Sequence, residues 1–244
     1  MAAIRIVDVV DEATFGLIPP CADPRFDHRT CDYWEDADRG SKIARPSWLE
    51  RAAVAAPPAR PKTGNPFLDD AAERETFNPF APAGDALVDN PFAPKPKPKA
   101  TVPSDAPRKL GLLGRGLAVF GSYAKVLLVD DEAAGWTQFG PLSAYPRASR
   151  VRDLYPQLPE TPLPAVITCI ATTREARRQG LALRLVRAVC DDLAGRGFAA
   201  VEAYPELGVA EDATSAATPA FWIAAGFAIA VDDERFPVMR RELA

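Results

Sequence analysis

The amino-acid sequence predicts an α/β (α+β) domain, in which a central mixed sheet of about six to seven strands is flanked by helices. Three observations support this prediction. Apolar stretches of strand length alternate with amphipathic helical patterns between residues 108 and 244. One β-branched run at 166–172 passes through a polar turn into a long helical pattern at 180–194, as in a strand–helix–strand crossover. The prolines are unevenly spread, which separates a long insertion from the rest of the chain.

Length and composition narrow the class of protein. The chain has 244 residues and is 48% hydrophobic, which is enough for a sizeable core. A net charge of −4 provides no basic excess for nucleic acid or an anionic membrane. No apolar run reaches the roughly 18 residues that a membrane-spanning helix needs, and no secretory signal is evident. We therefore expect no nucleic-acid partner, no membrane contact and a cytoplasmic location.

The elements before the crossover are predicted from periodicity and capping residues. Ser47 is a suitable cap for a short helix, and the apolar stripe after Arg108 has helical spacing. Residues 141–164, rich in Tyr and Pro, are expected to be irregular. The predicted elements are a strand at 3–10, helices at 47–55 and 109–120, and hairpin strands at 124–129 and 135–139 around a turn at 130–132.

The elements after the crossover close the sheet. Residues 198–204 form the next strand, which we expect to run parallel to the strand at 166–172. Thr218 followed by Pro219 places a cap before a proline at the first helical position, and this helix is expected to end before Gly226. The final predicted elements are strands at 227–232 and 237–243.

The domain is predicted to be interrupted. Twelve of the 25 prolines fall within residues 57–107, where no apolar period persists and the run at 94–99 is polyproline-like. Such a segment cannot bury enough surface to offset its ordering entropy, so we expect a disordered insertion. The domain would then consist of an N-terminal part at 1–56 and a core at 108–244.

The predicted insertion contains three copies of Asn-Pro-Phe. Asn-Pro favours a turn that presents the following aromatic ring outward, and disordered segments often carry short docking motifs. A protein partner bound through three weak copies would gain avidity. A linker expanded by duplication explains the repeat equally well. The copies are Asn65-Pro66-Phe67, Asn78-Pro79-Phe80 and Asn90-Pro91-Phe92.

The cysteines and the single histidine suggest little metal or nucleophile chemistry. Cys21, His28 and Cys31 share one loop, but their spacing matches no common zinc site and a fourth ligand is not evident. A structural loop is the better interpretation. Cys169 and Cys190 lie in apolar patterns and are expected to be buried thiols.

The strongest functional signal is the loop that opens the helix at 180–194. Its residues are Arg177, Arg178, Gln179, Gly180, Leu181 and Ala182. The first N–H groups of a helix have no intrahelical partner, and the helix dipole favours an anion there. Gly180 allows the backbone to approach a ligand closely, and the arginines add positive charge. This pattern indicates a pyrophosphate site; an ordinary solvent role for Arg177 is the alternative.

The spacing Arg177-x-x-Gly180-x-Ala182, after a strand and opening a helix, resembles the acyl-CoA-binding motif of the GNAT N-acetyltransferases. The segment 218–227, TPAFWIAAGF, resembles a second motif of that family. The resemblance covers 108–244 well and 1–56 plausibly. Within that family, the segment 31–35, CDYWE, makes the chain resemble an uncharacterised actinobacterial branch.

The resemblance implies acetyl-CoA as cofactor and transfer of its acetyl group to a primary amine of a small molecule or a protein. It implies that the backbone of Ile170, Ala171 and Thr172 pairs with the pantetheine arm, while Arg177 to Ala182 hold the pyrophosphate. Many members use a tyrosine as the acid at the position of Trp222, whose indole cannot donate that proton.

Two residues of the predicted strand at 198–204 are candidates for the missing acid–base chemistry. Glu202 is a candidate base that could face the cleft, with a solvated strand face as the alternative, and Tyr204 is a candidate acid. The competing function is a catalytically weak or inactive binding or scaffold protein with the same fold, recruited through its Asn-Pro-Phe copies. Trp222 favours that alternative, whereas the Arg177–Ala182 loop favours the enzyme.

Overall fold

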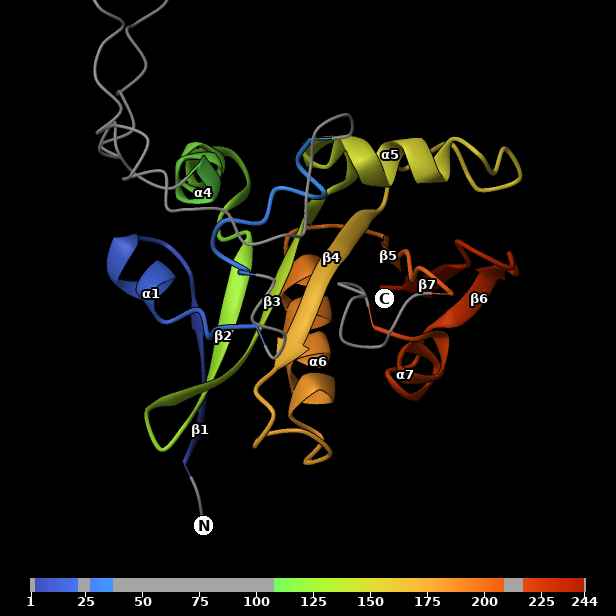
Figure 1. Ribbon diagram of the computed structural model, residues 1–244. Helices are drawn as coiled ribbons and strands as arrows, with labels where there is room; N and C mark the ends of the chain where they lie inside the picture. Colours follow the sequence, from blue (N-terminus) through green and yellow to red (C-terminus); the bar gives the residue numbers. More distant parts are fainter. Residues whose placement is uncertain (1–2, 22–26, 37–107, 209–216, 244) are drawn as a thin grey trace, which may run out of the picture.

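The structure is a computed structural model that describes residues 3–21, 27–36, 108–208 and 217–243. Its centre is one seven-stranded mixed sheet in the order β1-β2-β3-β4-β5-β7-β6. Figure 1 shows helices on both faces of this sheet, with α6 behind β3 and β4 and with α4 and α5 on the opposite side. The predicted fold class, a mixed sheet flanked by helices, is therefore confirmed.

The first half of the described chain forms three antiparallel strands at one edge of the sheet. Asp130 and Asp131 form the tight turn between β2 and β3, and both have left-handed backbone conformations with φ of 49° and 68°, as such hairpin turns require. The elements are β1 (Ile4–Asp8), α1 (Glu12–Gly16), α4 (Arg108–Phe120), β2 (Ala124–Val129) and β3 (Glu132–Pro141).

The segment 141–164, predicted to be irregular, contains two helical elements, which corrects that expectation. A short 3-10 helix, η2 (Leu142–Ala144), is followed by the α-helix α5 (Pro146–Arg152). Pro146 occupies the first helical position of α5, where its fixed φ is compatible and its missing N–H costs nothing. The proline that suggested irregular structure is therefore a helix start.

The second half contains the predicted crossover. Strand β5 runs parallel to β4, and the pairing joins Ala165 to Val201 and Val166 to Glu202. The helix between them begins after Gly180 and packs its apolar face on β2, β3 and β4. The elements are β4 (Ala165–Thr172), α6 (Leu181–Gly195), β5 (Ala200–Ala203), α7 (Pro219–Ala224), β6 (Ala228–Val231) and β7 (Val238–Glu242).

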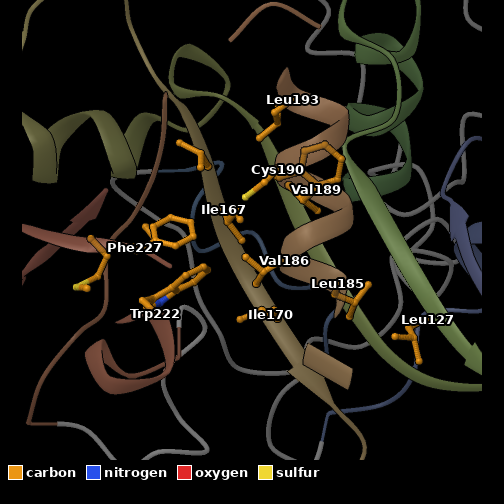
Figure 2. Close-up of a cluster of buried hydrophobic side chains, with 14 of the residues drawn as sticks. Leu127, Ile167, Ile170, Leu185, Val186, Val189, Cys190, Leu193, Trp222 and Phe227 are labelled. Carbon is orange, nitrogen blue, oxygen red and sulfur yellow. The ribbon is translucent and has the colours of Figure 1, made fainter. Parts of the chain in front are cut away.

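A β-bulge divides β4. The β3–β4 register shifts so that Gln138 pairs with Cys169 but Phe139 pairs with Ile167, which leaves Thr168 as the extra residue. Strict alternation would place Ile167 and Ile170 on opposite faces. Because of the bulge, both lie in the core under α6 (Figure 2). The bulge thus changes which side chains of β4 face each layer.

The core has a layer on each side of the sheet. The layer under α6 and α7 contains Leu185, Val189 and Trp222 together with Ile167, as Figure 2 shows. On the opposite face, Phe15 of α1 and Leu110 of α4 pack on Trp136 and its neighbours. A third cluster joins α5 to β4, β5 and β7.

Several sequence-based predictions fall on residues outside the described part of the chain. They are the helix at 47–55, the disordered insertion at 57–107 and the three Asn-Pro-Phe copies, which remain predictions. The division into 1–56, 57–107 and 108–244 likewise remains a prediction. Among the described residues, no helix is both long enough and apolar enough to cross a bilayer.

Candidate functional site

The loop between β4 and α6 has a backbone shape that fits a ligand. Gly180 is the N-cap of α6 with a left-handed φ of 73°, and Arg178 is also left-handed with φ of 60°. A Cβ atom at Gly180 would meet no protein atom within 4 Å. Glycine is therefore required here by the backbone conformation and not by crowding from the protein. The space beside its Cα is open.

The first turn of α6 presents unpaired donors at this loop. The first backbone hydrogen bond of the helix runs from the Arg184 N–H to the Gly180 carbonyl, so the N–H groups of residues 181–183 precede the helical pattern. Gly180 has no side chain to cap them. Arg177, Arg178 and Gln179 are exposed around them. Positive charge and unpaired donors therefore coincide at the predicted position.

Three members of the loop are less available to a ligand than the sequence suggested. Leu181 is buried in the core beneath α6, so only its backbone can serve a ligand. The Gln179 side chain donates from Nε2 to the Glu175 carbonyl at 2.9 Å and closes the loop on itself. Ala182 is partly buried and packs against the same core.

Strand β4 has an open edge that leads to this loop. On one side it pairs with β3 as far as Thr172, opposite Gly135. On the other side its pairing with β5 ends at Val166, and no strand of the described chain continues it. The predicted pantetheine-pairing residues, Ile170, Ala171 and Thr172, belong to this open stretch. From Thr168 to Thr172 the strand rises roughly 13 Å, ending where the loop begins.

Glu202 lies where β4 and β5 begin to separate, and its carboxylate is buried. Its exposed fraction is 0%, so the alternative of a solvated strand face is wrong. Arg152 Nε of α5 donates to Oε2 at 3.1 Å, and Arg240 Nη1 of β7 donates to Oε1 at 2.7 Å. Both oxygens are therefore occupied by ion pairs that join three elements.

Tyr204 shares this cluster. Its hydroxyl donates to Glu202 Oε2 at 2.5 Å. Burial, followed by the charge of Glu202, raises the pKa of the Tyr204 hydroxyl well above its usual value. The proton therefore stays on Tyr204 and is directed at a neighbouring carboxylate. The structure brings the two predicted acid–base residues together, and their contacts favour a structural role; catalysis by them remains a prediction.

Trp222 is a core residue. It is fully buried, and its ring centroid lies 4.7 Å from that of Phe227 and 5.2 Å from that of Phe221 (Figure 2). Thr218 caps the helix α7 through its side chain, which accepts from the Phe221 N–H at 3.4 Å. The aromatic motif of this segment therefore secures α7 on the sheet.

Sequence reasoning missed a buried polar cluster on the opposite face of the sheet. Gln138 Nε2 of β3 donates to Glu35 Oε1 at 2.6 Å, and Lys109 Nζ of α4 donates to Gln138 Oε1 at 2.9 Å. Lys109 Nζ also lies 3.4 Å from Glu35 Oε1 and 5.5 Å from the Trp136 ring centroid. Glu35 ends the CDYWE segment, which was the signal available in the sequence.

Of the three residues considered as metal ligands, His28 and Cys31 lie beside this cluster. No group of three or more His, Cys, Asp or Glu side chains suited to a metal is present among the described residues. The four cysteines are free thiols, and burial raises the pKa of Cys31 and of Cys169. His28 instead packs on Trp136, with ring centroids 5.3 Å apart.

His28 is expected to make stability depend on pH. Burial, and then the charge of Lys109, lowers its pKa from 6.5 to about 4. Between these values the unfolded chain is protonated and the folded chain is not, so stability is present above pH 6.5 and is lost as pH falls. The loss amounts to about 3 kcal/mol.

Two measurements check this expectation. NMR of the single histidine should yield a pKa near 4. The unfolding free energy of the wild type should decrease from pH 7 to pH 4 by more than that of His28→Gln, which lacks the titrating group. Parallel curves for the two proteins would contradict the expected effect.

No family model matches this chain, and no curated protein matches it significantly. Among solved structures, it is similar to a protein from Desulfovibrio desulfuricans provisionally assigned as an acetyltransferase of the GNAT family (22% identity, 59% of this chain, 84% of that chain, TM-score 0.37). It is also similar to the PaiA N-acetyltransferase from Thermoplasma acidophilum in complex with coenzyme A (10% identity, 57% of this chain, 72% of that chain, TM-score 0.39). A third similar structure is Naa20 from Chaetomium thermophilum in complex with a bisubstrate analogue (16% identity, 55% of this chain, 73% of that chain, TM-score 0.38).

Proposed function

We propose that this chain is an acetyl-CoA-dependent N-acetyltransferase of the GNAT superfamily that acts on a primary amine of a small molecule or a protein. One observation supports the proposal above all others. The open edge of β4 runs without interruption into a loop where the left-handed Gly180 and the uncapped first turn of α6 face open space. A ligand with an extended amide-bearing arm and an adjoining anionic group requires such an open strand edge beside such a loop.

The residues present fit acetyl-CoA. The exposed Arg177 and Arg178 and the N–H groups of residues 181–183 would hold the pyrophosphate. The open backbone edge of 170–172 would pair with the amide-bearing arm. When bound, acetyl-CoA supplies a thioester whose acetyl carbon forms a bond to the amine nitrogen as the C–S bond breaks and the thiol leaves.

The general base must come from this chain. Glu202 and Tyr204 were the sequence-based candidates, and they lie close to the point where β4 and β5 separate. Arg152 and Arg240 pair with the two carboxylate oxygens of Glu202, so neither oxygen is left to contact a substrate. We therefore assign it to holding α5, β5 and β7 together, and the role of base remains open to another carboxylate.

Gly180→Ala tests the proposed cofactor site. The substitution is expected to weaken acetyl-CoA binding about tenfold, a loss of about 1.4 kcal/mol, because the new methyl group enters the space beside the loop. Isothermal titration calorimetry measures the affinity. The left-handed backbone also costs about 1 kcal/mol of stability, which a denaturation curve measures separately.

Gly197→Ala is the matched control. Gly197 has a similar φ of 84° and equally open surroundings, but it lies beyond the other end of α6. It should lose the same stability and retain wild-type affinity. Equal loss of affinity in both variants, or a wild type that does not bind acetyl-CoA, would contradict the proposal.

A further inference from the structure

The polar cluster beneath α4 contains buried polar atoms for which the described residues provide no hydrogen-bond partner. In the described part of the chain, His28 Nε2, Thr30 Oγ1, Glu35 Oε2 and Trp136 Nε1 are buried and make no hydrogen bond. The exposed fractions are 8% for His28, 6% for the Glu35 side chain and 0% for Trp136. Each buried polar atom left unpaired costs about 1–3 kcal/mol. Three of these residues, His28, Glu35 and Trp136, lie around Lys109, and their unmet hydrogen bonds indicate that a polar ligand completes the cluster.

The four unpaired atoms offer complementary chemistry. The Trp136 indole can only donate, and the Glu35 carboxylate oxygen can only accept. The Thr30 hydroxyl and a neutral His28 imidazole can do either. A matching ligand carries a donor for Glu35 and an acceptor for Trp136. A primary amine with a neighbouring carbonyl or hydroxyl oxygen meets both requirements.

The cluster adjoins the bulge in β4. Glu35 is hydrogen-bonded to Gln138, whose partner in β4 is Cys169, the neighbour of the bulge residue Thr168. Thr168 Oγ1 contacts the Gln138 carbonyl at 3.4 Å. The open edge of β4 closes two residues earlier, at Val166. The unpaired oxygen of Glu35 thus belongs to a network at the closed end of that edge, away from the Gly180 loop.

We propose that this cluster is the acceptor site, that it binds a small primary amine with a neighbouring oxygen, and that Glu35 is the general base. The assignment of a base rests on the proposed acetyltransferase function, whereas the amine site does not. Glu35 Oε1 is occupied by Gln138 and faces Lys109, while Oε2 remains for the amine.

The proton balance is simple. Glu35 Oε2 accepts one proton from the ammonium group and becomes a carboxylic acid, which leaves a neutral amine whose nitrogen lone pair forms the new C–N bond. The second proton of that nitrogen leaves with the thiol, and Glu35 later returns its proton to solvent.

Lys109 Nζ lies 3.4 Å from Glu35 Oε1, so the protein already contacts that oxygen, whereas Oε2 has no hydrogen-bond partner and can meet a ligand. The other titratable groups facing Glu35 are Cys31, Cys169 and Tyr145. Burial raises the pKa of each of these three, so they remain neutral at pH 7.

Glycinamide is the smallest suitable probe, since it combines a primary amine with a carbonyl oxygen. The Trp136 indole N–H and the His28 imidazole are reporters on either side of the site. In ¹H–¹⁵N NMR spectra of the full chain, both are expected to shift saturably with glycinamide. The variant Glu35→Gln/Lys109→Met removes both charges at once, so no buried charge is left unpaired, and it should bind at least tenfold more weakly. Asp131→Asn, in an exposed surface pair, is the control that should match the wild type.

Two further measurements separate the possible failures. Acetyl-CoA affinity should be unchanged in the double variant, while acetylation of glycinamide should fall by about 10²–10⁴-fold. No saturable shift in the wild type, or an equal shift in the double variant, would overturn the acceptor site. Unchanged acetylation of glycinamide by the double variant would overturn Glu35 as base. A wild type that binds glycinamide but not acetyl-CoA would remove the acetyltransferase function and leave the amine site standing.

Discussion

Glu202→Ala is expected to lower the free energy of unfolding by about 3–5 kcal/mol. The carboxylate is fully buried and forms ion pairs with Arg152 and Arg240, which are only 10% and 12% exposed. Removing it takes away the ion pair of the buried Arg152 and one of the two carboxylate partners of Arg240, which costs far more than an exposed ion pair contributes. Urea denaturation followed by circular dichroism measures the loss. Glu202→Gln keeps the shape and should also be destabilised.

Glu242→Ala is the matched control for this prediction. Glu242 pairs with the same Arg240, at 2.7 Å, but its side chain is 71% exposed. Its loss should cost less than about 1 kcal/mol. A Glu202→Ala protein of wild-type stability that no longer acetylates any amine would instead show that Glu202 is a catalytic residue, as the sequence had suggested.

Trp222→Ala is expected to lower the free energy of unfolding by about 3–5 kcal/mol. The ring is 0% exposed and packs against Phe227 and the face of the sheet beneath α6 (Figure 2). Removing it opens a large cavity that the short helix α7 cannot fill by collapsing. Thermal and urea denaturation measure the effect.

Ile223→Ala provides the comparison for Trp222. Ile223 is the next residue on α7 but is 53% exposed, so its truncation should change stability by about 0.5 kcal/mol at most. Similar losses for the two variants would mean that α7 is not held by Trp222. The comparison also bears on function, because a residue this deep in the core serves packing.

Local sequence patterns were sufficient to predict most strands of the sheet and several helices that pack on it. The hairpin, the helix after Arg108 and the crossover from β4 through α6 to β5 were predicted within a few residues, because periodicity and turn chemistry act over short distances. Gly180 was also identified from the sequence, because a glycine between a strand and a helix allows a ligand to approach the backbone; its positive φ became known only from the structure. The helix α5 was missed because proline was taken as a sign of irregular chain.

The sequence by itself determined the fold class, the parallel crossover and the position of the loop at Arg177–Ala182. Only the tertiary structure decided that Glu202 is buried between arginines of α5 and β7, and that Glu35, Lys109 and Gln138 meet beneath α4. The physical reason is sequence distance: Glu35 and Gln138 are 103 residues apart. No short-range pattern records which charges will share one buried volume, and burial decides whether a carboxylate is solvated, structural or reactive.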